Sequence, residues 1–258
     1  MSWWEDLVEY YGVSKEDAIA LGIRKTGRRP NLPGSKTCKP VSGKNFEELW
    51  DEKPRDTIQQ KMDFYKDIGA WQVFRQCNYR STFDYGKLFF PYIKSKTTSL
   101  LEYGCGVAPL TNYIVENKET IGDIKGMSFA LVDVVGEHLE FAKWRLKNKA
   151  PDVKFDFYEI TAENPIPKFT NNFDIICIMD VLEHLPNPYD VMLNILGYLN
   201  NEAVMVMTWV DKSGGKSGGP DLEESENERK ITMKLICDNF DLLKNGSIQI
   251  YRKKLNGK

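Results

Sequence analysis

The sequence contains no long run of apolar residues. Its most apolar segment, residues 175–179, is bounded by Asp174 and Asp180, whereas a helix that spans a bilayer needs roughly 20 apolar residues. The N-terminus also lacks a basic start followed by an apolar stretch, which is the pattern of a secretory signal. We therefore expect a chain without a membrane-spanning helix, and a cytoplasmic location.

Cysteine and histidine are scarce. The 258 residues include five cysteines and two histidines, and no two cysteines have the Cys-x-x-Cys spacing. This excludes a zinc ribbon, and the odd number of cysteines argues against a dense disulfide framework. Neither sign of charge dominates, because the net charge is −2. The surface as a whole therefore does not attract nucleic acid or an anionic membrane.

The first 44 residues predict two short helices followed by a basic arm. Apolar residues recur with helical spacing from Trp3 to Tyr11, Ser14 begins a second helix, and Gly22 is a plausible end for it. Residues 23–44 contain seven basic residues and no acid, and are rich in proline and glycine. Such a segment is either a solvated linker or an arm that meets an anionic acceptor.

Residues 45–95 predict a helical cap with many aromatic side chains. An aromatic stripe at helical spacing belongs to a core more often than to a ligand site. Three polar residues interrupt this stripe and are candidates for binding a substrate: Arg75, Tyr79 and Arg80.

From residue 96 to the C-terminus, apolar strands alternate with helical segments. We predict strands over residues 99–103, 128–134, 153–159, 173–179 and 203–210. This alternation is typical of an α/β fold with a doubly wound, Rossmann-like, mostly parallel sheet. The pair Asn245-Gly246 between two apolar segments predicts a terminal antiparallel hairpin. The chain would thus consist of N-terminal helices with the arm, a helical cap, and a Rossmann-like core over residues 96–258.

The first predicted strand runs directly into a glycine loop. Gly104 and Gly106 permit unusual backbone angles and let a ligand approach the main chain. The next strand ends in Asp133, whose carboxylate can accept hydrogen bonds from both ribose hydroxyls of a nucleoside. Two further loops, at residues 161–164 and 180–188, follow later strands. All four segments would meet at the carboxyl edge of the sheet, where such folds bind ligands.

This constellation resembles the class I S-adenosylmethionine-dependent methyltransferases, in particular the branch that acts on small molecules. Glu102-x-Gly104-x-Gly106 is similar to the first motif of that family, and residues 173–184 are similar to its fourth. The resemblance implies S-adenosylmethionine as cofactor and transfer of a methyl group to an O or N atom of an acceptor. We expect a small-molecule acceptor. If the basic arm attracts the acceptor, the acceptor would be anionic.

The resemblance also implies roles for individual residues. Glu102 would order the glycine loop and the region of the methionine ammonium, and Gly104 and Gly106 would lie against the cofactor. Asp133 would hold the ribose. Ala162 and Glu163 would border the adenine. Met179 and Asp180 would flank the amino-acid and sulfonium region of the cofactor.

Two positions depart from the family pattern. Ala108, followed by proline, stands where the family often has glycine, and Thr161 replaces an acid that commonly meets the adenine amino group. Alanine is small enough for binding to survive. The second departure leaves Glu163 as a substitute candidate for the adenine contact.

His184 follows the fourth strand and is the candidate catalytic residue, as a general base with an ordinary pKa near 6.5. Its alternative role is to cap or pack the following turn. Glu183 could ligate a metal together with it, but two ligands do not make a metal site, so we expect none. We expect the second histidine, His138, on the surface of a helix.

Two other classes of protein remain as alternatives. An NAD-type oxidoreductase would share the glycine loop and the ribose acid, but its fingerprint requires a third glycine where this chain has Pro109. A protein of methyltransferase fold could act on RNA or a protein partner through the basic arm, or bind without catalysis. The near-neutral net charge disfavours nucleic acid, and the sequence indicates no oligomeric state.

Overall fold

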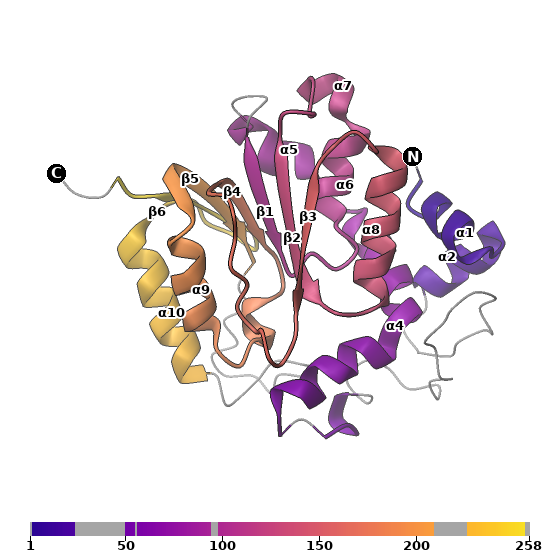
Figure 1. Ribbon diagram of the computed structural model, residues 1–258, viewed down its shortest axis with the longest axis horizontal. Coiled ribbons are helices and arrows are strands. Elements are labelled where there is room, and N and C mark those ends of the chain that lie inside the picture. The colour runs from indigo at the N-terminus through magenta and orange to yellow at the C-terminus, as the bar shows by residue number, and fades with distance from the viewer. Residues whose placement is uncertain (1, 24–49, 55, 94–97, 209–225, 256–258) are drawn as a thin grey trace.

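The computed structural model describes residues 2–23, 50–54, 56–93, 98–208 and 226–255 (Figure 1). The helices are α1 (Glu5–Tyr11), α2 (Lys15–Ile23), α4 (Ile58–Arg80), α5 (Tyr85–Phe89), α6 (Pro109–Glu116), α7 (Lys118–Ile121), α8 (Glu137–Lys149), α9 (Pro188–Leu196) and α10 (Glu226–Asn239), with 3₁₀ helices η1 (Phe90–Tyr92) and η2 (Leu182–His184). Apart from its first residue, the basic arm predicted at residues 23–44 lies outside the described residues.

Within the described residues, seven strands form one sheet in the order β3-β2-β1-β4-β5-β7-β6. They are β1 (Ser99–Tyr103), β2 (Ser128–Val134), β3 (Phe155–Ile160), β4 (Phe173–Ile178), β5 (Leu199–Met207), β6 (Phe240–Lys244) and β7 (Gln249–Lys253). The first five strands pair in parallel, and β7 pairs antiparallel with both β5 and β6. The predicted fold class, including the terminal hairpin, is confirmed.

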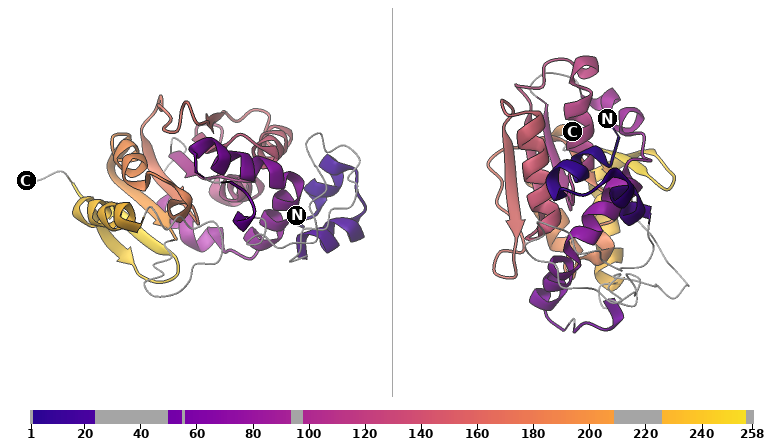
Figure 2. Two further views of the ribbon diagram at one scale, coloured as in Figure 1. Left: turned by 90° about the horizontal axis from the view of Figure 1, so that it is seen from below. Right: turned by 90° about the vertical axis from the view of Figure 1, so that its right-hand side faces the viewer.

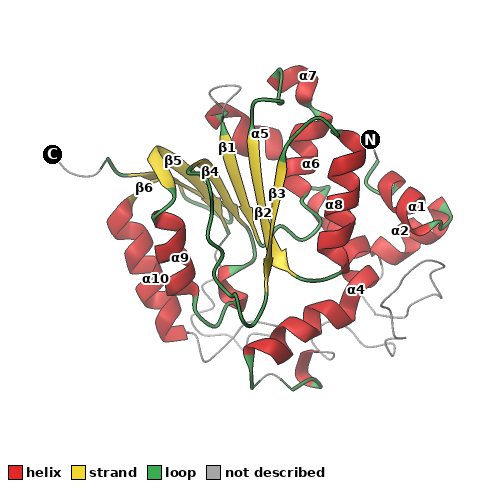
Figure 3. Ribbon diagram, in the orientation of Figure 1, coloured by secondary structure: helices red, strands yellow, loops and turns green. Residues whose placement is uncertain are grey.

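Helices cover both faces of the sheet (Figures 1 and 3). Every residue of β1 is buried, and neighbouring residues of the strand pack into opposite layers. Leu100 belongs to a cluster with apolar residues of α5, α6 and α8. Leu101 belongs to a second cluster, with residues of α9 and α10. Burial on two faces explains why the strand is continuous in apolar residues rather than alternating.

The N-terminal helices pack at one end of the molecule, and the C-terminal hairpin lies at the other (Figure 2). Leu7 and Tyr11 of α1 share a buried cluster with Phe74 of α4 and Phe141 of α8. Gly22 does not end the second helix as predicted, because α2 continues to Ile23. A Cβ at Gly22 would lie 2.4 Å from the ring of Trp3, so packing against that ring accounts for the glycine.

Helix α4 is the element that connects these helices to the edge of the sheet. It begins with a capping box in which Thr57 and Gln60 bond reciprocally, and it is kinked at Gly69, where φ is 35° and ψ −125°. Beyond the kink it packs against α2 and α8. In Figure 1 the helix crosses beneath the carboxyl ends of the strands.

The fifth strand differs most from its prediction, since β5 begins at Leu199 rather than at residue 203. Its first half is polar, and Glu202 has φ 60°. The pairing of β4 with β5 also shifts register between Phe173 and Ile175. In a bulged, polar start of this kind, apolar and polar residues do not alternate, so the sequence does not indicate a strand there.

Candidate active site

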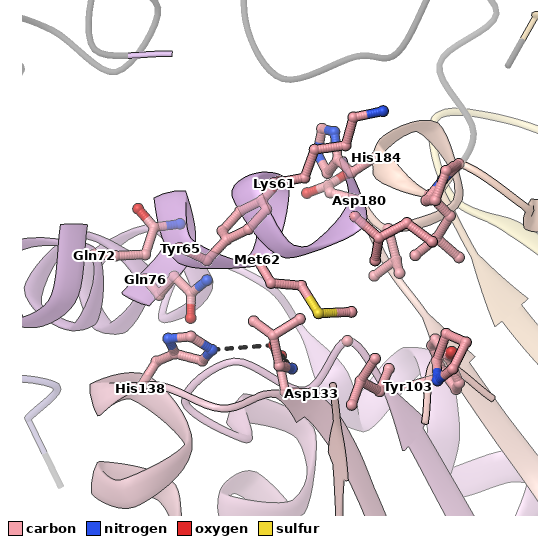
Figure 4. Close-up of a pocket in the computed structure, with 18 of the residues that line it drawn as sticks. Lys61, Met62, Tyr65, Gln72, Gln76, Tyr103, Asp133, His138, Asp180 and His184 are labelled. Atoms are coloured by element: carbon pink, nitrogen blue, oxygen red, sulfur yellow. Dashed lines mark hydrogen bonds and ion pairs between the residues drawn. The ribbon is translucent and has the colours of Figure 1, made fainter. Parts of the chain in front are cut away.

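A cavity of about 360 Å³ lies between α4 and the carboxyl edge of the sheet (Figure 4). Its wall combines side chains of α4 with the segments that follow β1, β2, β3 and β4. The sequence-predicted residues that line it are Arg75, Tyr79, Arg80, Gly104, Asp133, Asp180 and His184. The fold therefore brings together residues that are more than 100 positions apart in the chain.

The glycine loop after β1 is held by the protein itself. Gly104 has φ 67° and Gly106 has φ 52°, a region that favours glycine. A Cβ at Gly104 would lie 2.2 Å from Val181 Cγ2, and one at Gly106 would lie 2.2 Å from Gln76 Oε1. Gln76 Oε1 also accepts a hydrogen bond from Val107 N at 3.1 Å. Helix α4 thus fixes the loop, a contact that the sequence analysis missed.

Glu102 lies under this loop, with 3% of its surface exposed. Its carboxylate accepts hydrogen bonds from the backbone N–H groups of Leu110 and Thr111 at 3.1 and 3.0 Å, and from the Thr111 hydroxyl at 2.7 Å. Burial raises the pKa of Glu102, and the bonds from Thr111 and Leu110 oppose that rise. The side chain therefore satisfies free N–H groups at the start of α6, which orders the junction between loop and helix.

Asp133 is the second-last residue of β2 and is bonded on both carboxylate oxygens. Oδ2 accepts from Gly106 N, and Oδ1 accepts from Val134 N at 2.7 Å and from His138 Nε2 at 3.0 Å. The expectation that His138 lies on the surface is wrong, because this side chain is 3% exposed and lines the cavity. His138 belongs to the first turn of α8, and its side chain reaches Asp133 near the end of β2.

Asp180 follows β4 in a left-handed conformation, with φ 55°. Arg80 Nη2 of α4 lies 3.0 Å from Asp180 Oδ2 and donates to the Met179 carbonyl at 3.1 Å. The Thr208 hydroxyl donates to Asp180 Oδ1 at 2.7 Å and accepts from Asp180 N at 2.6 Å. A non-glycine residue at positive φ persists only where its surroundings determine it strongly, and these contacts do so here.

A second, smaller cavity of about 20 Å³ adjoins the first beside Gly104. Arg80 and Tyr85 line it, and so do Glu102 and Met179. Arg80 Nη1 and Tyr85 Oη are buried, and neither has a hydrogen-bond partner in the described parts of the chain. Unpartnered buried donors are costly, so this point of the site is suited to an acceptor group of a ligand.

His184 ends the short helix η2 and lines the main cavity. Figure 4 places it with Lys61 and Asp180 on one side of the cavity, and Asp133 with His138 on another. Lys61, Met62 and Tyr65 of the first half of α4 also line the cavity and were not predicted as site residues, since Met62 and Tyr65 belong to an apolar stripe that we expected in the core. Their spacing of three to four residues is the helical stripe that could have indicated them.

The loop after β3 contributes less than expected. Ala162 and Glu163 do not line the cavity, whose wall there is formed by Ile160 and Pro165. Glu163 is exposed, and a hydrogen bond from its own backbone N–H, followed by one from the Thr161 hydroxyl, lowers its pKa. Both residues therefore lie beside the candidate site rather than in it.

Within the described residues, the structure shows which metal ligands, thiols and apolar helices the chain offers. In them, no group of three or more histidine, cysteine, aspartate or glutamate side chains is arranged to hold a metal ion. The thiols of Cys77, Cys105, Cys177 and Cys237 are free. No helix in the described ranges is long and apolar enough to cross a membrane.

A doubly wound sheet, a glycine loop after its first strand and an acid after its second define the class of nucleotide-binding α/β proteins. Residues 94–255 match the family model of a methyltransferase domain, and the chain belongs to this family. No curated protein sequence matches the chain.

Solved structures resemble the chain in fold. The [4+2]-cyclase SpnF is 17% identical over 66% of this chain and 60% of its own, with a TM-score of 0.48; this chain thus spans less than two thirds of the cyclase. A SAM-dependent methyltransferase from Aquifex aeolicus is 19% identical over 66% of this chain and 89% of its own, with a TM-score of 0.48. The mitomycin 7-O-methyltransferase MmcR is 13% identical over 70% of this chain and 56% of its own, with a TM-score of 0.48.

Proposed function

We propose that this chain is an S-adenosylmethionine-dependent methyltransferase that acts on an O or N atom of a small-molecule acceptor. Family membership supports the reaction class. The observation that carries the proposal is the position of Asp133, which is fixed beside the glycine loop and opens onto a cavity of about 360 Å³. This volume lies within the range of small-molecule sites, about 300–1,000 Å³.

The residues present fit the cofactor. Asp133 Oδ2 bonds only to Gly106 N among the described residues, so it retains acceptor capacity for a ribose hydroxyl. The smaller cavity offers the unpartnered Arg80 Nη1 and Tyr85 Oη, which suit the carboxylate of the cofactor's amino-acid end. Between them, Gly104 brings the main chain close to the ligand.

When bound, the cofactor supplies a methyl group that its sulfonium already activates. The work left to this chain is to align the acceptor with that group, which is catalysis by proximity and orientation. Helix α4 forms one wall of the cavity in which this alignment would take place. His184 is the candidate general base, which would take the proton of a hydroxyl or amine acceptor.

Arg75 is the candidate anchor for an anionic group on the acceptor. It is half-buried, lines the cavity and lies 4.8 Å from the ring of Trp71. Burial lowers its pKa, and no carboxylate pairs with it among the described residues. Tyr79 lies beside it in the cavity wall and is 53% exposed, so it would contact the outer part of the acceptor.

The experiment uses the purified chain, S-adenosylmethionine with a labelled methyl group, and a fractionated cell extract. We expect label in a small molecule, identified by mass spectrometry, and binding of S-adenosylhomocysteine but not of NAD by calorimetry. Label in RNA or protein would favour action through the basic arm. Cofactor binding without any transfer of label would favour a non-catalytic binder, and binding of NAD alone would overturn the proposal.

A further inference from the structure

His138 and Asp133 form the hydrogen bond drawn at the base of the cavity (Figure 4). Their side chains are 4% and 14% exposed, respectively. Since a carboxylate only accepts, the Nε2–H of His138 donates to Oδ1 over 3.0 Å. His138 Nδ1 is buried and has no partner among the described residues. Among the described residues, the imidazole therefore forms a hydrogen bond with Asp133 alone.

The ring occupies the space next to the main chain of its own segment. A Cβ at Gly136 would lie 2.8 Å from His138 Cε1 and 3.1 Å from Nδ1. These distances leave no space for a side chain at position 136. The segment thus reads Asp-x-x-Gly-x-His over residues 133–138, and its glycine makes room for the histidine.

The hydrogen bonds determine which part of the carboxylate is open. An ionised carboxylate has about four acceptor sites, two on each oxygen. Val134 N and His138 Nε2 take both sites of Oδ1, and Gly106 N takes one site of Oδ2. One site of Oδ2 remains. Rotation of the carboxylate would break all three bonds, so that site keeps a fixed direction.

We propose that His138 is a positioning residue for the ribose of the cofactor, and this rests on the proposed function. It holds Asp133 in the orientation in which Oδ2 can accept a ribose hydroxyl. Without this donor, Oδ1 keeps one bond to a backbone N–H, and the carboxylate gains freedom that ligand binding must then remove. In this role His138 acts on the ribose through Asp133.

The test measures binding of S-adenosylhomocysteine to the full chain by calorimetry. His138→Gln places an amide N–H at a reach similar to that of Nε2, and should bind within about threefold of wild type. His138→Leu keeps an apolar side chain but has no donor. We expect affinity to fall about tenfold, which corresponds to about 1.4 kcal/mol, because binding must then immobilise a carboxylate that wild type already holds in place.

A double-mutant cycle separates positioning from simple packing. In an Asp133→Ala background, His138→Leu should cause no further loss of affinity, because its effect passes through Asp133. An additional loss of about tenfold in that background would overturn the proposal, as would equal losses for the Leu and Gln variants. Thermal unfolding checks each variant. If His138→Leu does not fold, His138→Asn, whose amide is too short to reach Oδ1, replaces it in the cycle.

The outcomes also distinguish this inference from the proposed function. If wild type binds no S-adenosylhomocysteine, the proposed function fails. If Asp133→Ala weakens binding while His138→Leu leaves it unchanged, the cofactor site stands and the role of His138 is wrong.

Discussion

The guanidinium of Arg80 lies 3.0 Å from the carboxylate of Asp180 and also bonds the Met179 carbonyl. Arg80 is the last residue of α4, and Asp180 follows β4. One side chain therefore fastens α4 to the loop after β4, and both line the cavity. Nη1 of the same guanidinium is buried and has no partner among the described residues, and Arg80 also lines the smaller cavity.

Arg80→Lys should weaken binding of S-adenosylhomocysteine about tenfold, because an ammonium cannot replace the fork of donors that a guanidinium offers. Methylthioadenosine lacks the amino-acid carboxylate and serves as the control ligand. Calorimetry should show the loss for the first ligand only. Equal losses for both ligands would mean that Arg80 acts through the loop and not through the carboxylate.

Asp133→Ala should lower cofactor affinity about tenfold to a hundredfold, since it removes a charged acceptor worth about 1.5–3 kcal/mol. Asp156 on β3 is the matched control. It pairs with Lys154 at 3.0 Å and does not line the cavity. Calorimetry on folded Asp156→Ala should give the wild-type dissociation constant. An unchanged constant in folded Asp133→Ala would remove Asp133 from the site.

Gly106→Ala should destabilise the protein and weaken cofactor binding, because Gln76 must move away from Val107 N and the bond from Gly106 N to Asp133 is disturbed. The Cβ would lie 2.2 Å from Gln76 Oε1, in addition to the strain of φ 52°. Gly12 has φ 64° but nothing within 4 Å of its Cβ position, so Gly12→Ala isolates the backbone strain, about 1–2 kcal/mol. Denaturant unfolding and calorimetry measure both effects. If the two variants lose equal stability, the contact with Gln76 is unimportant. A substitution at Gly104 would likewise disturb the loop before any ligand binds, because its Cβ would lie 2.2 Å from Val181 Cγ2.

His184→Gln should lower the turnover rate about a hundredfold, the lower end of what a general base contributes. Cofactor affinity should stay unchanged, because the substitution leaves Asp133 and Arg80, the proposed contacts of the cofactor, in place. Single-turnover kinetics with the identified acceptor measure the rate. An unaltered rate would leave His184 as a packing residue of the turn after β4.

Asp6→Ala should destabilise the fold by about 1.5 kcal/mol, the lower end for a hydrogen bond to a charged group, because Lys149 keeps its pair with Glu116 at 2.6 Å. Asp6 is 7% exposed, and its carboxylate lies 2.6 Å from Lys149 Nζ of α8. Glu9 is exposed on the same helix, and Glu9→Ala should change stability little. Urea unfolding of both variants provides the measurement, and equal midpoints would contradict a role for α1 in stability.

The sequence by itself determined the order of elements. Strands 99–103 and 128–134 were predicted with the bounds that the structure has, because burial on two faces leaves a continuous apolar run that is visible locally. The glycine loop and the terminal hairpin were equally readable, since each depends on a few neighbouring residues. Asp133 was found because an acid at the end of a second parallel strand must lie at the carboxyl edge.

Only the tertiary structure decided how side chains from distant segments meet. Arg80 and Asp180 are 100 positions apart, and no local period relates them. Gln76 reaches the glycine loop because α4 is kinked at Gly69 and packs across the sheet. His138 was placed on the surface because helical spacing alone does not show which way the first turn of α8 faces. The structure shows that this turn faces inward, where His138 is buried and bonds to Asp133.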